Sequence, residues 1–475
     1  MVIPEEIPNL VAGRAVPAAS GQSIEKLRPT DETLLCRAAR SGAEDVAAAV
    51  SAARAAQPAW AERTAVERGD IVRELALLLR ERRDEVSAIV AEETGKPLEL
   101  AEGETDAAVE MGLFVAGEGR RSYGRTMTAS MPHRTVLTMR QPLGVAALIM
   151  SFNTPLPNIA WKAFPAIFCG NATVAKPSEH TPASAWLFGE LAREAGVPDG
   201  VLNVIHGFGP EAGAPLVEHP DVDLVSFTGS ATTGRWINET AGRRLAKVCL
   251  ELGGKNALVV CDDADIDPAV RWALASAFSN AGQRCASASR LVVFDGVYDA
   301  FREQLLAGVQ GLEPQPVISR DSMDRISDAV RRAAGEGATV LSGGERLDRP
   351  GWYFSPTVVE NAASDAEISR TELFGPLTVL YRVGDLDEAI SLVNDSPYGL
   401  TAAIHTASVH RALRFAERVQ AGVVVVNAGT HGSEPHMGFG GVKESGTGWR
   451  EAGVEALDVY SDLKVVNLVV DPMKA

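Results

Sequence analysis

Apolar segments of strand length alternate with helical or glycine-containing segments along most of the chain, and this alternation constrains the fold more than any other feature. Strands are predicted at residues 144–150, 172–175, 201–205, 224–227, 248–251 and 257–260, with a second series at 290–294, 378–381, 402–405 and 422–427. Strands joined through helices pair in parallel, because the helix carries the chain back to the end of the sheet at which the previous strand began. The sequence therefore predicts an α/β fold with doubly wound parallel sheets.

The segment that precedes these strands is predicted to be helical. Residues 43–109 are rich in alanine, glutamate and arginine, and Gly95, Lys96 and Pro97 interrupt them. Residues 134–140 alternate between apolar and polar side chains and predict a further strand. The sequence has no repeat of solenoid length and no low-complexity linker, so we expect its parts to pack against one another.

The length, charge and cysteine content exclude several classes of protein. A chain of 475 residues is too long for one hydrophobic core, and its net charge of −17 disfavours nucleic acid and anionic membranes as partners. No apolar run has the length of a membrane span, and residues 1–6 lack the pattern of a signal peptide. Five scattered cysteines without CxxC spacing favour a reducing compartment, so we expect a cytoplasmic protein.

Cys285 is the first candidate for a catalytic residue. It follows an apolar segment at residues 272–278 that predicts a buried helix, and Gly282 is expected to break this helix so that a small turn carries the thiol. A turn lets a second reactant approach, and its backbone amides can favour the thiolate. The alternative is a cysteine that serves only as a small buried apolar residue.

Polar side chains follow several predicted strands, at the sheet edge where open α/β sheets bind ligands. Lys176 ends one strand and Glu179 follows three residues later, so both can contact ribose hydroxyls. Glu251 ends another strand, where burial can raise its pKa toward that of a general base. Asn153 follows a third strand and can donate its amide to an oxyanion. An ordinary strand end or turn is the alternative for each residue.

Two further segments suit a nucleotide. Residues 226–234 predict a turn into a helix N-terminus with Ser230 as the cap, and free amides at such an end can bind a pyrophosphate, although the GxGxxG pattern is absent. Glu372 and Phe374 precede a Gly-Pro pair, where they can hold a sugar hydroxyl and flank a flat ring. A loop with a buried aromatic anchor is the alternative for this second segment.

Two histidines, His431 and His436, raise the question of a metal site. They lie in a loop that contains glycine and proline, without the helical spacing of metal-binding histidines. No third ligand is evident from the sequence, so we predict no metal.

In this order the segments resemble the aldehyde dehydrogenase superfamily over about residues 43–460. The resemblance depends on six motifs, which are Lys-Pro-Ser-Glu at 176–179, Phe-Thr-Gly-Ser at 227–230, Glu-Leu-Gly-Gly-Lys at 251–255, Gly-Gln-Arg-Cys at 282–285, Glu-Leu-Phe-Gly-Pro at 372–376 and Phe-Gly-Gly-Val-Lys-Glu-Ser-Gly at 439–446. Single motifs are weak, whereas the ordered set is specific. The resemblance implies a doubly wound Rossmann-like cofactor domain, an α/β catalytic domain and a small β oligomerisation element.

The resemblance also implies the catalytic roles. Cys285 is expected to attack the aldehyde and to carry first a thiohemiacetal and then a thioester. The Asn153 amide and the backbone N–H of Cys285 are expected to hold the oxyanion, and Glu251 to activate the hydrolytic water. Relatives that transfer the acyl group to coenzyme A typically lack a glutamate at this position, so the expected product is a free carboxylic acid.

The implied cofactor is NAD, with NADP as the alternative. In the family pattern Lys176 and Glu179 hold the adenosine ribose, Ser230 and its turn hold the pyrophosphate, and Glu372 holds the nicotinamide ribose. Glu179 favours NAD because it would repel a 2′-phosphate, although some relatives keep this glutamate and accept NADP. The other residues expected to bind the cofactor are Ser151, Phe152, Ser178, Gly209, Phe227, Thr228, Gly229, Gly234, Leu252 and Phe374.

The expected domain boundaries follow the same pattern. Residues 1–122 and 142–252 are predicted to form the NAD(P)-binding domain and residues 253–445 the catalytic domain. Residues 123–141 and 446–475 are predicted to form the oligomerisation element of a homodimer or homotetramer.

Two departures from the family pattern occur. Residues 154–157 are Thr-Pro-Leu-Pro, so the aromatic residue that usually follows Asn153 is missing and the wall of the substrate tunnel is altered. Residues 308–319 look shortened, which we expect to affect a surface loop and not the active centre.

The identity of the aldehyde stays open at this stage. Residues 429–437, with their two histidines, resemble the corresponding loop of semialdehyde-oxidising relatives, so an aldehyde that carries a carboxylate is an alternative substrate. A more remote alternative is a catalytically idle binding protein that kept the fold. That hypothesis predicts loss of Cys285, Glu251 or Asn153, and the sequence retains all three.

Overall fold

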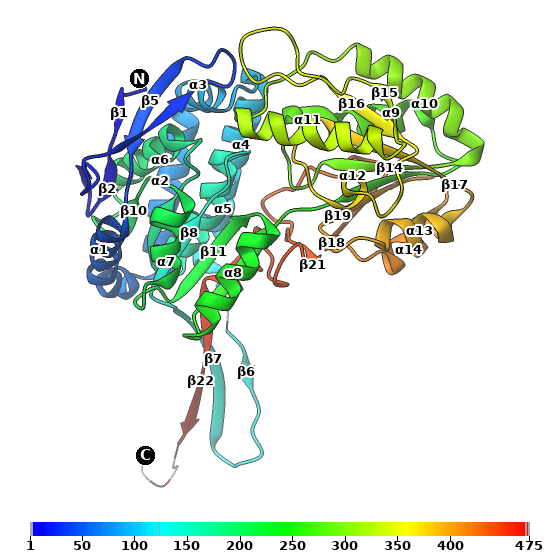
Figure 1. Ribbon diagram of the computed structural model, residues 1–475. Helices are drawn as coiled ribbons and strands as arrows, with labels where there is room; N and C mark the ends of the chain where they lie inside the picture. The colour runs from blue at the N-terminus through cyan, green and yellow to red at the C-terminus, as the bar shows by residue number, and fades with distance from the viewer. Residues whose placement is uncertain (1–2, 123, 471–472, 474–475) are drawn as a thin grey trace.

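Two seven-stranded sheets with helices packed around them form the body of the molecule, and a narrow antiparallel arm projects from it (Figure 1). The structure is a computed structural model that describes residues 3–122, 124–470 and 473. No helix within these residues is both long and apolar enough to cross a membrane.

The first sheet has the strand order β12-β11-β8-β9-β10-β2-β3. Five of its strands are parallel neighbours, as the alternating sequence predicts: β8 (Val145–Ile149), β9 (Ala172–Lys176), β10 (Leu202–Val204), β11 (Leu224–Gly229) and β12 (Lys247–Leu252). The short strands β2 (Asn9–Val11) and β3 (Arg14–Val16) extend one edge in antiparallel fashion. The crossover helices are α5 (Pro155–Phe168), α6 (Pro182–Glu194), α7 (Ala214–Glu218), which continues from a π-helical turn at Gly209–Gly213, and α8 (Ala231–Gly242).

The second sheet has the order β15-β16-β17-β14-β13-β19-β20. The predicted strands are β13 (Asn256–Val260), β14 (Ala288–Phe294), β17 (Leu377–Val383), β19 (Thr401–His405) and β20 (Val423–Val426). The sequence patterns missed β16 (Thr357–Glu360) and the antiparallel edge strand β15 (Thr339–Ser342). The helices of this part are α9 (Ile266–Phe278), α10 (Asp295–Gln310), α11 (Arg320–Gly335), α12 (Glu367–Arg370), α13 (Leu386–Asn394) and α14 (Val409–Arg418), and a small sheet pairs β18 (Tyr398–Gly399) with β21 (Val442–Lys443). Helix α15 (Ala456–Val459) instead packs against α5 of the first sheet.

The N-terminal region adds a three-stranded sheet and four helices. The sheet consists of β1 (Glu6–Ile7), β5 (Leu34–Ala39) and β4 (Ser23–Leu27), and the helices are α1 (Ala43–Glu62), α2 (Ala65–Glu81), α3 (Arg83–Thr94) and α4 (Leu98–Gly117), followed by a 3-10 turn at Glu118–Arg120. The predicted interruption is confirmed at Gly95, which ends α3 with φ +73°. A Cβ there would lie 2.6 Å from Cγ of Pro316, so only glycine fits.

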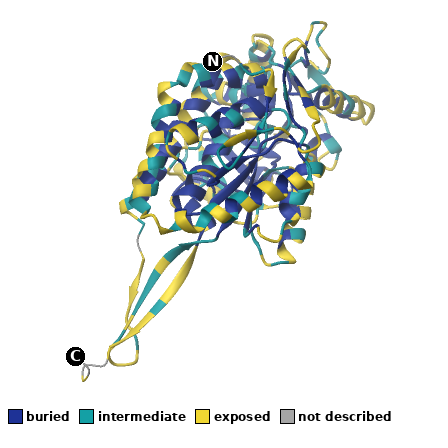
Figure 2. Cartoon of the chain, turned by 90° about the vertical axis from the view of Figure 1, so that its left-hand side faces the viewer, coloured by how far each residue is buried: buried dark blue, intermediate teal, exposed yellow. Residues whose placement is uncertain are grey.

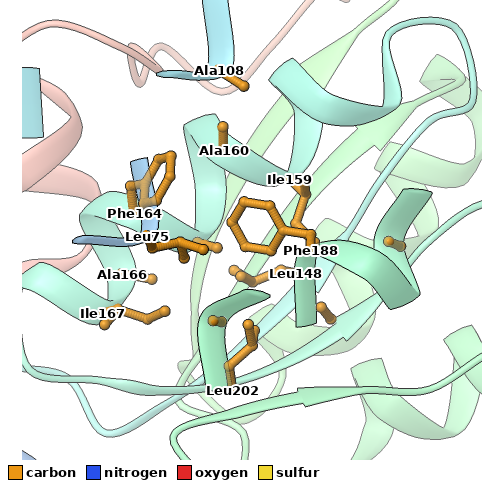
Figure 3. Packing of buried hydrophobic residues seen from close by; sticks show 14 of the residues in the cluster. Leu75, Ala108, Leu148, Ile159, Ala160, Phe164, Ala166, Ile167, Phe188 and Leu202 are labelled. Atoms are coloured by element: carbon orange, nitrogen blue, oxygen red, sulfur yellow. The ribbon is translucent and has the colours of Figure 1, made fainter. Parts of the chain in front are cut away.

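Helices α5 and α6 pack on the first sheet through large apolar side chains. Phe164 and Phe188 are fully buried, and their ring centroids lie 5.6 Å apart. Leu148 of β8 and Leu75 of α2 belong to the same cluster (Figure 3). This packing fixes β8, whose carboxyl end leads into the candidate site.

The arm contains β6 (Thr126–Met127), β7 (Arg134–Pro142) and β22 (Ser461–Val469), all antiparallel. The predicted strand at residues 134–140 is therefore confirmed, and it pairs with the C-terminal strand β22, with Arg140 opposite Leu463. Most of the arm is exposed (Figure 2), and the exposed side chains include Leu463 at 57% and Val465 at 56%. Exposed apolar side chains on a projecting strand pair leave surface that a second protein surface could cover.

Candidate active site

The carboxyl ends of β8, β9, β11 and β12 meet the second sheet at a groove with a volume of about 890 Å³. This volume is typical of sites that bind a cofactor or a substrate. The groove is lined by Ser151, Phe152, Asn153, Lys176, Ser178, Glu179, Gly209, Phe227, Thr228, Gly229, Ser230, Glu251, Leu252, Cys285, Glu372 and Phe374. Sixteen of the seventeen predicted site residues, which lie far apart in the sequence, thus contribute to one cavity.

Gly234 is the exception, because it does not line the groove. It is buried in α8, where a Cβ would lie 2.6 Å from Cδ2 of Leu252. Its role in the structure is to let α8 approach β12 closely. The lining residues that sequence patterns missed are Ile149, Met150, Pro210, Gly213, Ala214, Val217, Thr232, Thr233, Trp236, Ile237, Gly253 and Arg325.

Cys285 lies just after an unusual turn. Helix α9 ends at Phe278, before the glycine that was expected to break it, and Trp272 on this helix is 38% exposed rather than buried. Asn280 (φ 56°), Ala281 (φ 53°) and Gly282 (φ 66°) are left-handed in succession. Such backbone is costly for non-glycine residues and persists only where the surroundings enforce it.

Hydrogen bonds from three directions hold this turn. Asn256 donates through Nδ2 to the carbonyl oxygen of Cys285 (2.7 Å). The Ser287 hydroxyl donates to the carbonyl oxygen of Gly282 (2.9 Å), and the Ile318 N–H donates to Oε1 of Gln283 (2.9 Å). Through the last contact Ile318, near the end of the segment 308–319, anchors Gln283, the residue two positions before the thiol.

The Cys285 thiol is partly buried, and its surroundings disfavour the thiolate. Burial raises its pKa, and the carboxyl groups of Glu251 and Glu372 raise it further. The charge of Arg284 and the backbone N–H of Ala286 lower the pKa, but by less. The backbone N–H of Ala286 thus favours the thiolate, as expected of a turn, but the loss of solvation on burial has the larger effect on the pKa.

Glu251 is the penultimate residue of β12 and has the buried environment that the sequence predicted. It is 5% exposed, and burial raises its pKa well above the usual value, with Glu451 raising it further and Lys162 opposing. Its Oε1 is buried and has no hydrogen-bond partner among the residues that the structure describes. An unpartnered carboxyl oxygen with a raised pKa can accept a proton from a molecule in the groove.

Asn153 is tied to the cysteine turn through its backbone. Its carbonyl oxygen accepts hydrogen bonds from Nζ of Lys96 (2.8 Å) and from Nδ2 of Asn280 (3.0 Å). The side-chain amide of Asn153 takes part in no hydrogen bond within residues 3–122, 124–470 and 473 and lines the groove beside Cys285. It is therefore available to an oxyanion that forms there.

The other end of the groove suits a pyrophosphate. Ser230 caps α8, because its Oγ accepts a hydrogen bond from the N–H of Thr233 (3.3 Å), as predicted. Ser230, Thr232 and Thr233 at the start of α8 line the groove, where the helix dipole favours an anion. Lys176, at the end of β9, donates through Nζ to the carbonyl oxygen of Pro177 (2.7 Å), and burial lowers its pKa to about 8, with Glu179 opposing.

Glu372 is packed against the backbone that follows Glu251. Its Oε1 accepts a hydrogen bond from the N–H of Gly254 (3.1 Å), and a Cβ at Gly253 would lie 1.8 Å from its Oε2. Burial raises the pKa of Glu372 to about 7. Phe374, two residues later, has φ 54° and meets Phe152 edge to face with ring centroids 5.6 Å apart. The carboxylate and the aromatic pair are thus positioned at one place in the groove.

Within the described residues, no group of three or more histidine, cysteine or acidic side chains could hold a metal ion. His436 lies 3.7 Å from an oxygen of Glu434, and both side chains are exposed.

Comparisons with known proteins agree with this geometry. A family model described as the aldehyde dehydrogenase family matches residues 16–466. The chain is 39% identical over 471 residues to the mitochondrial benzaldehyde dehydrogenase of Antirrhinum majus, with 96% of this chain and 88% of that protein covered. It is 37% identical over 465 residues to the NADP(+) succinate-semialdehyde dehydrogenase GabD of Escherichia coli, with 96% of each covered. The crystal structure of an NAD-dependent aldehyde dehydrogenase from Sinorhizobium meliloti superimposes with a TM-score of 0.96 at 36% identity and covers 98% of this chain and 95% of that one.

Gly253→Ala tests whether the position of Glu372 matters for a dinucleotide. The new methyl group would displace the Glu372 carboxylate, so we expect the affinity for NAD+ to fall at least about tenfold, as for loss of a hydrogen bond to a charged group. Titration of protein fluorescence measures this affinity. Gly242→Ala is the matched control, because a Cβ there meets nothing within 4 Å. Equal affinities of the two variants would contradict a role for this carboxylate.

Proposed function

Because this chain belongs to the aldehyde dehydrogenase family, we propose that it oxidises its aldehyde on Cys285 and releases a free carboxylic acid. It is an oxidoreductase that acts on aldehydes with NAD or NADP as cofactor. The observation that carries the proposal is that Cys285, Glu251 and Asn153 line one groove with the residues expected to hold the cofactor.

Cys285 is the nucleophile in this proposal. After loss of its proton, Sγ attacks the aldehyde carbon to form a thiohemiacetal. The side-chain amide of Asn153 and the backbone N–H of Cys285 donate to the oxygen, which bears the negative charge that develops. Lys96 and Asn280 hold the backbone of Asn153, so this donor is positioned before the substrate arrives.

Glu251 acts in the second half of the reaction. Collapse of the thiohemiacetal expels a hydride and leaves a thioester on Cys285. Glu251 then accepts a proton from water as the water attacks the thioester carbon, and the carbon–sulfur bond breaks to release the acid. Its raised pKa and unpartnered Oε1 support this role, since both favour proton uptake.

The residues of the groove fit a nicotinamide dinucleotide. Gly253 leaves room for the Glu372 carboxyl, and the α8 N-terminus offers free amides next to Ser230. Glu372 would hold the nicotinamide ribose, the α8 N-terminus the pyrophosphate, and Lys176 with Glu179 the adenosine ribose. When bound, the nicotinamide supplies the hydride acceptor.

The two large sheets support the proposed division into a cofactor-binding domain and a catalytic domain. Residues 1–122 and 142–252 contain the first sheet and would bind the cofactor, and residues 253–445 contain the second sheet and would carry Cys285. Residues 123–141 and 446–475 contribute the arm, through which we propose that the protein forms a dimer or a tetramer. All five cysteines are free in the described chain, which supports a cytoplasmic location.

An aldehyde that carries a carboxylate is the second candidate substrate. The relative from Escherichia coli is named for succinate semialdehyde, which is such a compound. The specific observation that favours this candidate is the cation Arg284, directly before Cys285 in the chain, whose Nε is buried without a hydrogen-bond partner among the described residues.

Two variants test the covalent route. Cys285→Ala should abolish NADH formation, because the hydride can leave only after the thiol has added to the aldehyde. Glu251→Gln should still release about one equivalent of NADH per site rapidly, with steady-state turnover reduced about 10²- to 10⁴-fold. Stopped-flow absorbance at the NADH band separates the two phases. NADH formation by Cys285→Ala at the parent rate would overturn the proposed mechanism.

The pKa of Glu372 predicts how cofactor affinity depends on pH. Ribose hydroxyls donate to the ionised carboxylate, and burial has raised the pKa of this group to about 7. The affinity for NAD+ should therefore increase about tenfold from pH 6 to pH 8. At pH 6 binding must first remove the proton from the carboxyl group, whereas at pH 8 the group is already ionised. Glu372→Gln should remove this dependence, and an unchanged pH profile in the variant would assign it to another group.

Charged substitutions test the arm. Leu463→Glu together with Val465→Glu places two charges on one face of β22, since alternate residues of a strand share a face. We expect light scattering to show a smaller assembly for this double variant than for the parent. Asp462→Asn, which alters an exposed polar position of the same strand, is the control. An unchanged mass would exclude the arm as an essential contact.

A further inference from the structure

A buried ion pair, Lys96 with Glu104, lies behind the groove and contacts the backbone of Asn153. Lys96 follows Gly95 at the end of α3, and Glu104 lies in the second turn of α4. Their side chains are 1% and 6% exposed, and Nζ of Lys96 donates to Oε1 of Glu104. The same Nζ donates to the carbonyl oxygen of Asn153 (2.8 Å). Neither member of the pair is among the described residues that line the groove.

Stability alone does not account for this pair. Burial lowers the pKa of Lys96 and raises that of Glu104, because it disfavours the charged form of each group. The attraction between two buried charges roughly offsets their loss of solvation, so an apolar pair would stabilise the fold about as well. Oε2 of Glu104 is buried without a hydrogen-bond partner within the described chain. The pair is therefore better explained by the group that it holds than by the fold.

Helix α4 gives the pair a fixed position relative to Asn153. It packs against α5, which begins two residues after Asn153. Gly112 allows a close approach of the two helices, because a Cβ there would lie 2.9 Å from Cε2 of Phe164 in α5. Close packing of this kind resists displacement of one helix relative to the other. Nζ of Lys96 is thus held by Glu104 on an element that moves little relative to Asn153.

The carbonyl oxygen of Asn153 accepts two hydrogen bonds from different directions. Nζ of Lys96 donates from the α3–α4 junction, and Nδ2 of Asn280 donates from the cysteine turn (3.0 Å). A carbonyl oxygen has two acceptor sites, so both are used. The two donors fix the plane of the peptide bond after Asn153 and hence the direction in which its side chain leaves the backbone. The side-chain amide has no hydrogen bond to any described residue, so its direction depends on this backbone.

We propose that Lys96 and Glu104 are positioning residues for the oxyanion donor. Lys96 holds the backbone of Asn153, and Glu104 holds Lys96, so a carboxylate of α4 that touches neither substrate nor cofactor affects the first chemical step. This inference depends on the proposed function, in which the Asn153 amide donates to the oxygen of the thiohemiacetal. Stabilisation of a developing charge relies on donors that are already in place, so a small displacement of the amide slows the step.

A purely structural role for the pair makes a different prediction. If the pair only stabilised the fold, its loss would weaken NAD+ binding, thiol reactivity and catalysis together. A positioning role affects only the steps that need the oxyanion donor. Alkylation of Cys285 by iodoacetamide forms no oxyanion, so its rate separates the two roles.

The experiment measures the rate constant of the first turnover of NADH formation, with propanal and with benzaldehyde, at saturating NAD+. Lys96→Met should lower this rate constant about 10- to 100-fold with little change in KM. Glu104→Gln, which keeps an acceptor for Nζ of Lys96, should lower it much less. The affinity for NAD+ and the alkylation rate of Cys285 should match the parent in both variants. Glu102→Gln is the control, because Glu102 pairs with Arg83 (3.3 Å) on the partly exposed face of the same helix.

A double-mutant cycle with Asn153→Ala tests the route of the effect. Loss of the donor itself should lower the rate constant about 10²- to 10³-fold. Lys96→Met should have no further effect in that background, because the group that it positions is absent. Additive losses would overturn the inference.

A second variant removes both charges of the pair. Lys96→Met together with Glu104→Leu leaves no buried charge without its partner, and such replacements are often neutral for stability. This variant should fold and show the same loss of rate as Lys96→Met, so the test stands even where the single variant does not fold. A rate equal to that of the parent would show that Asn153 needs no such support.

One further outcome would overturn the inference while the proposed function stands. Equal losses in the first turnover, in NAD+ affinity and in the alkylation rate would assign the pair to the fold. Failure of the proposed function is separate, because it would show as NADH formation at the parent rate by Cys285→Ala or by Asn153→Ala.

Discussion

The hydrogen bond from the Asn280 side chain to the carbonyl oxygen of Asn153 connects the two halves of the active site. Asn153 follows β8 of the first sheet, and Asn280 belongs to the turn that leads through Cys285 into β14 of the second sheet. Asn280 is left-handed, and further bonds at Gly282, Gln283 and Cys285 hold the turn in this conformation. The proposed nucleophile and oxyanion donor, which follow strands of different sheets, are thereby held in one geometry, and the strained backbone accompanies that connection.

Loss of solvation is the common cause of the unusual titration behaviour in the groove. It raises the pKa values of Cys285, Glu251 and Glu372, so burial opposes the charged form of all three groups. In the proposed mechanism ligands change this environment: ribose hydroxyls would favour the ionised form of Glu372, and the aldehyde would react with the thiol. Because the pKa of Glu372 is higher in the folded protein than in the unfolded chain, its ionisation lowers the free energy of unfolding of the ligand-free protein as the pH rises to about 7. Above that pH the folded protein holds a charged carboxylate in a buried position.

Sequence patterns predicted the residues whose position follows from local structure. Glu251 and Lys176 end parallel strands and Ser230 caps a helix, so the topology alone brings them to one sheet edge. Patterns could not predict the left-handed Asn280 and Ala281. Their residue types do not specify a left-handed conformation, and hydrogen bonds to distant parts of the chain enforce it. The same limit applies to the groove residues Trp236 and Arg325, to the edge strand β15, and to the bond between Ile318 and Gln283. These features depend on contacts between segments that are distant in the chain.

The overall charge of the protein makes the local cations of the groove important. With a net charge of −17 the chain repels anions at a distance, yet its cofactor carries phosphates and its second candidate substrate carries a carboxylate. At physiological ionic strength the repulsion is screened beyond about 8 Å, so attraction must come from charges within the site itself. Lys176 and Arg325 line the cofactor groove, and Arg284 lies next to the thiol. Anion recognition in this molecule is therefore expected to be a short-range property of these few cations, of which Lys176 is buried, and their removal should affect binding more than a change in the acidic surface around them.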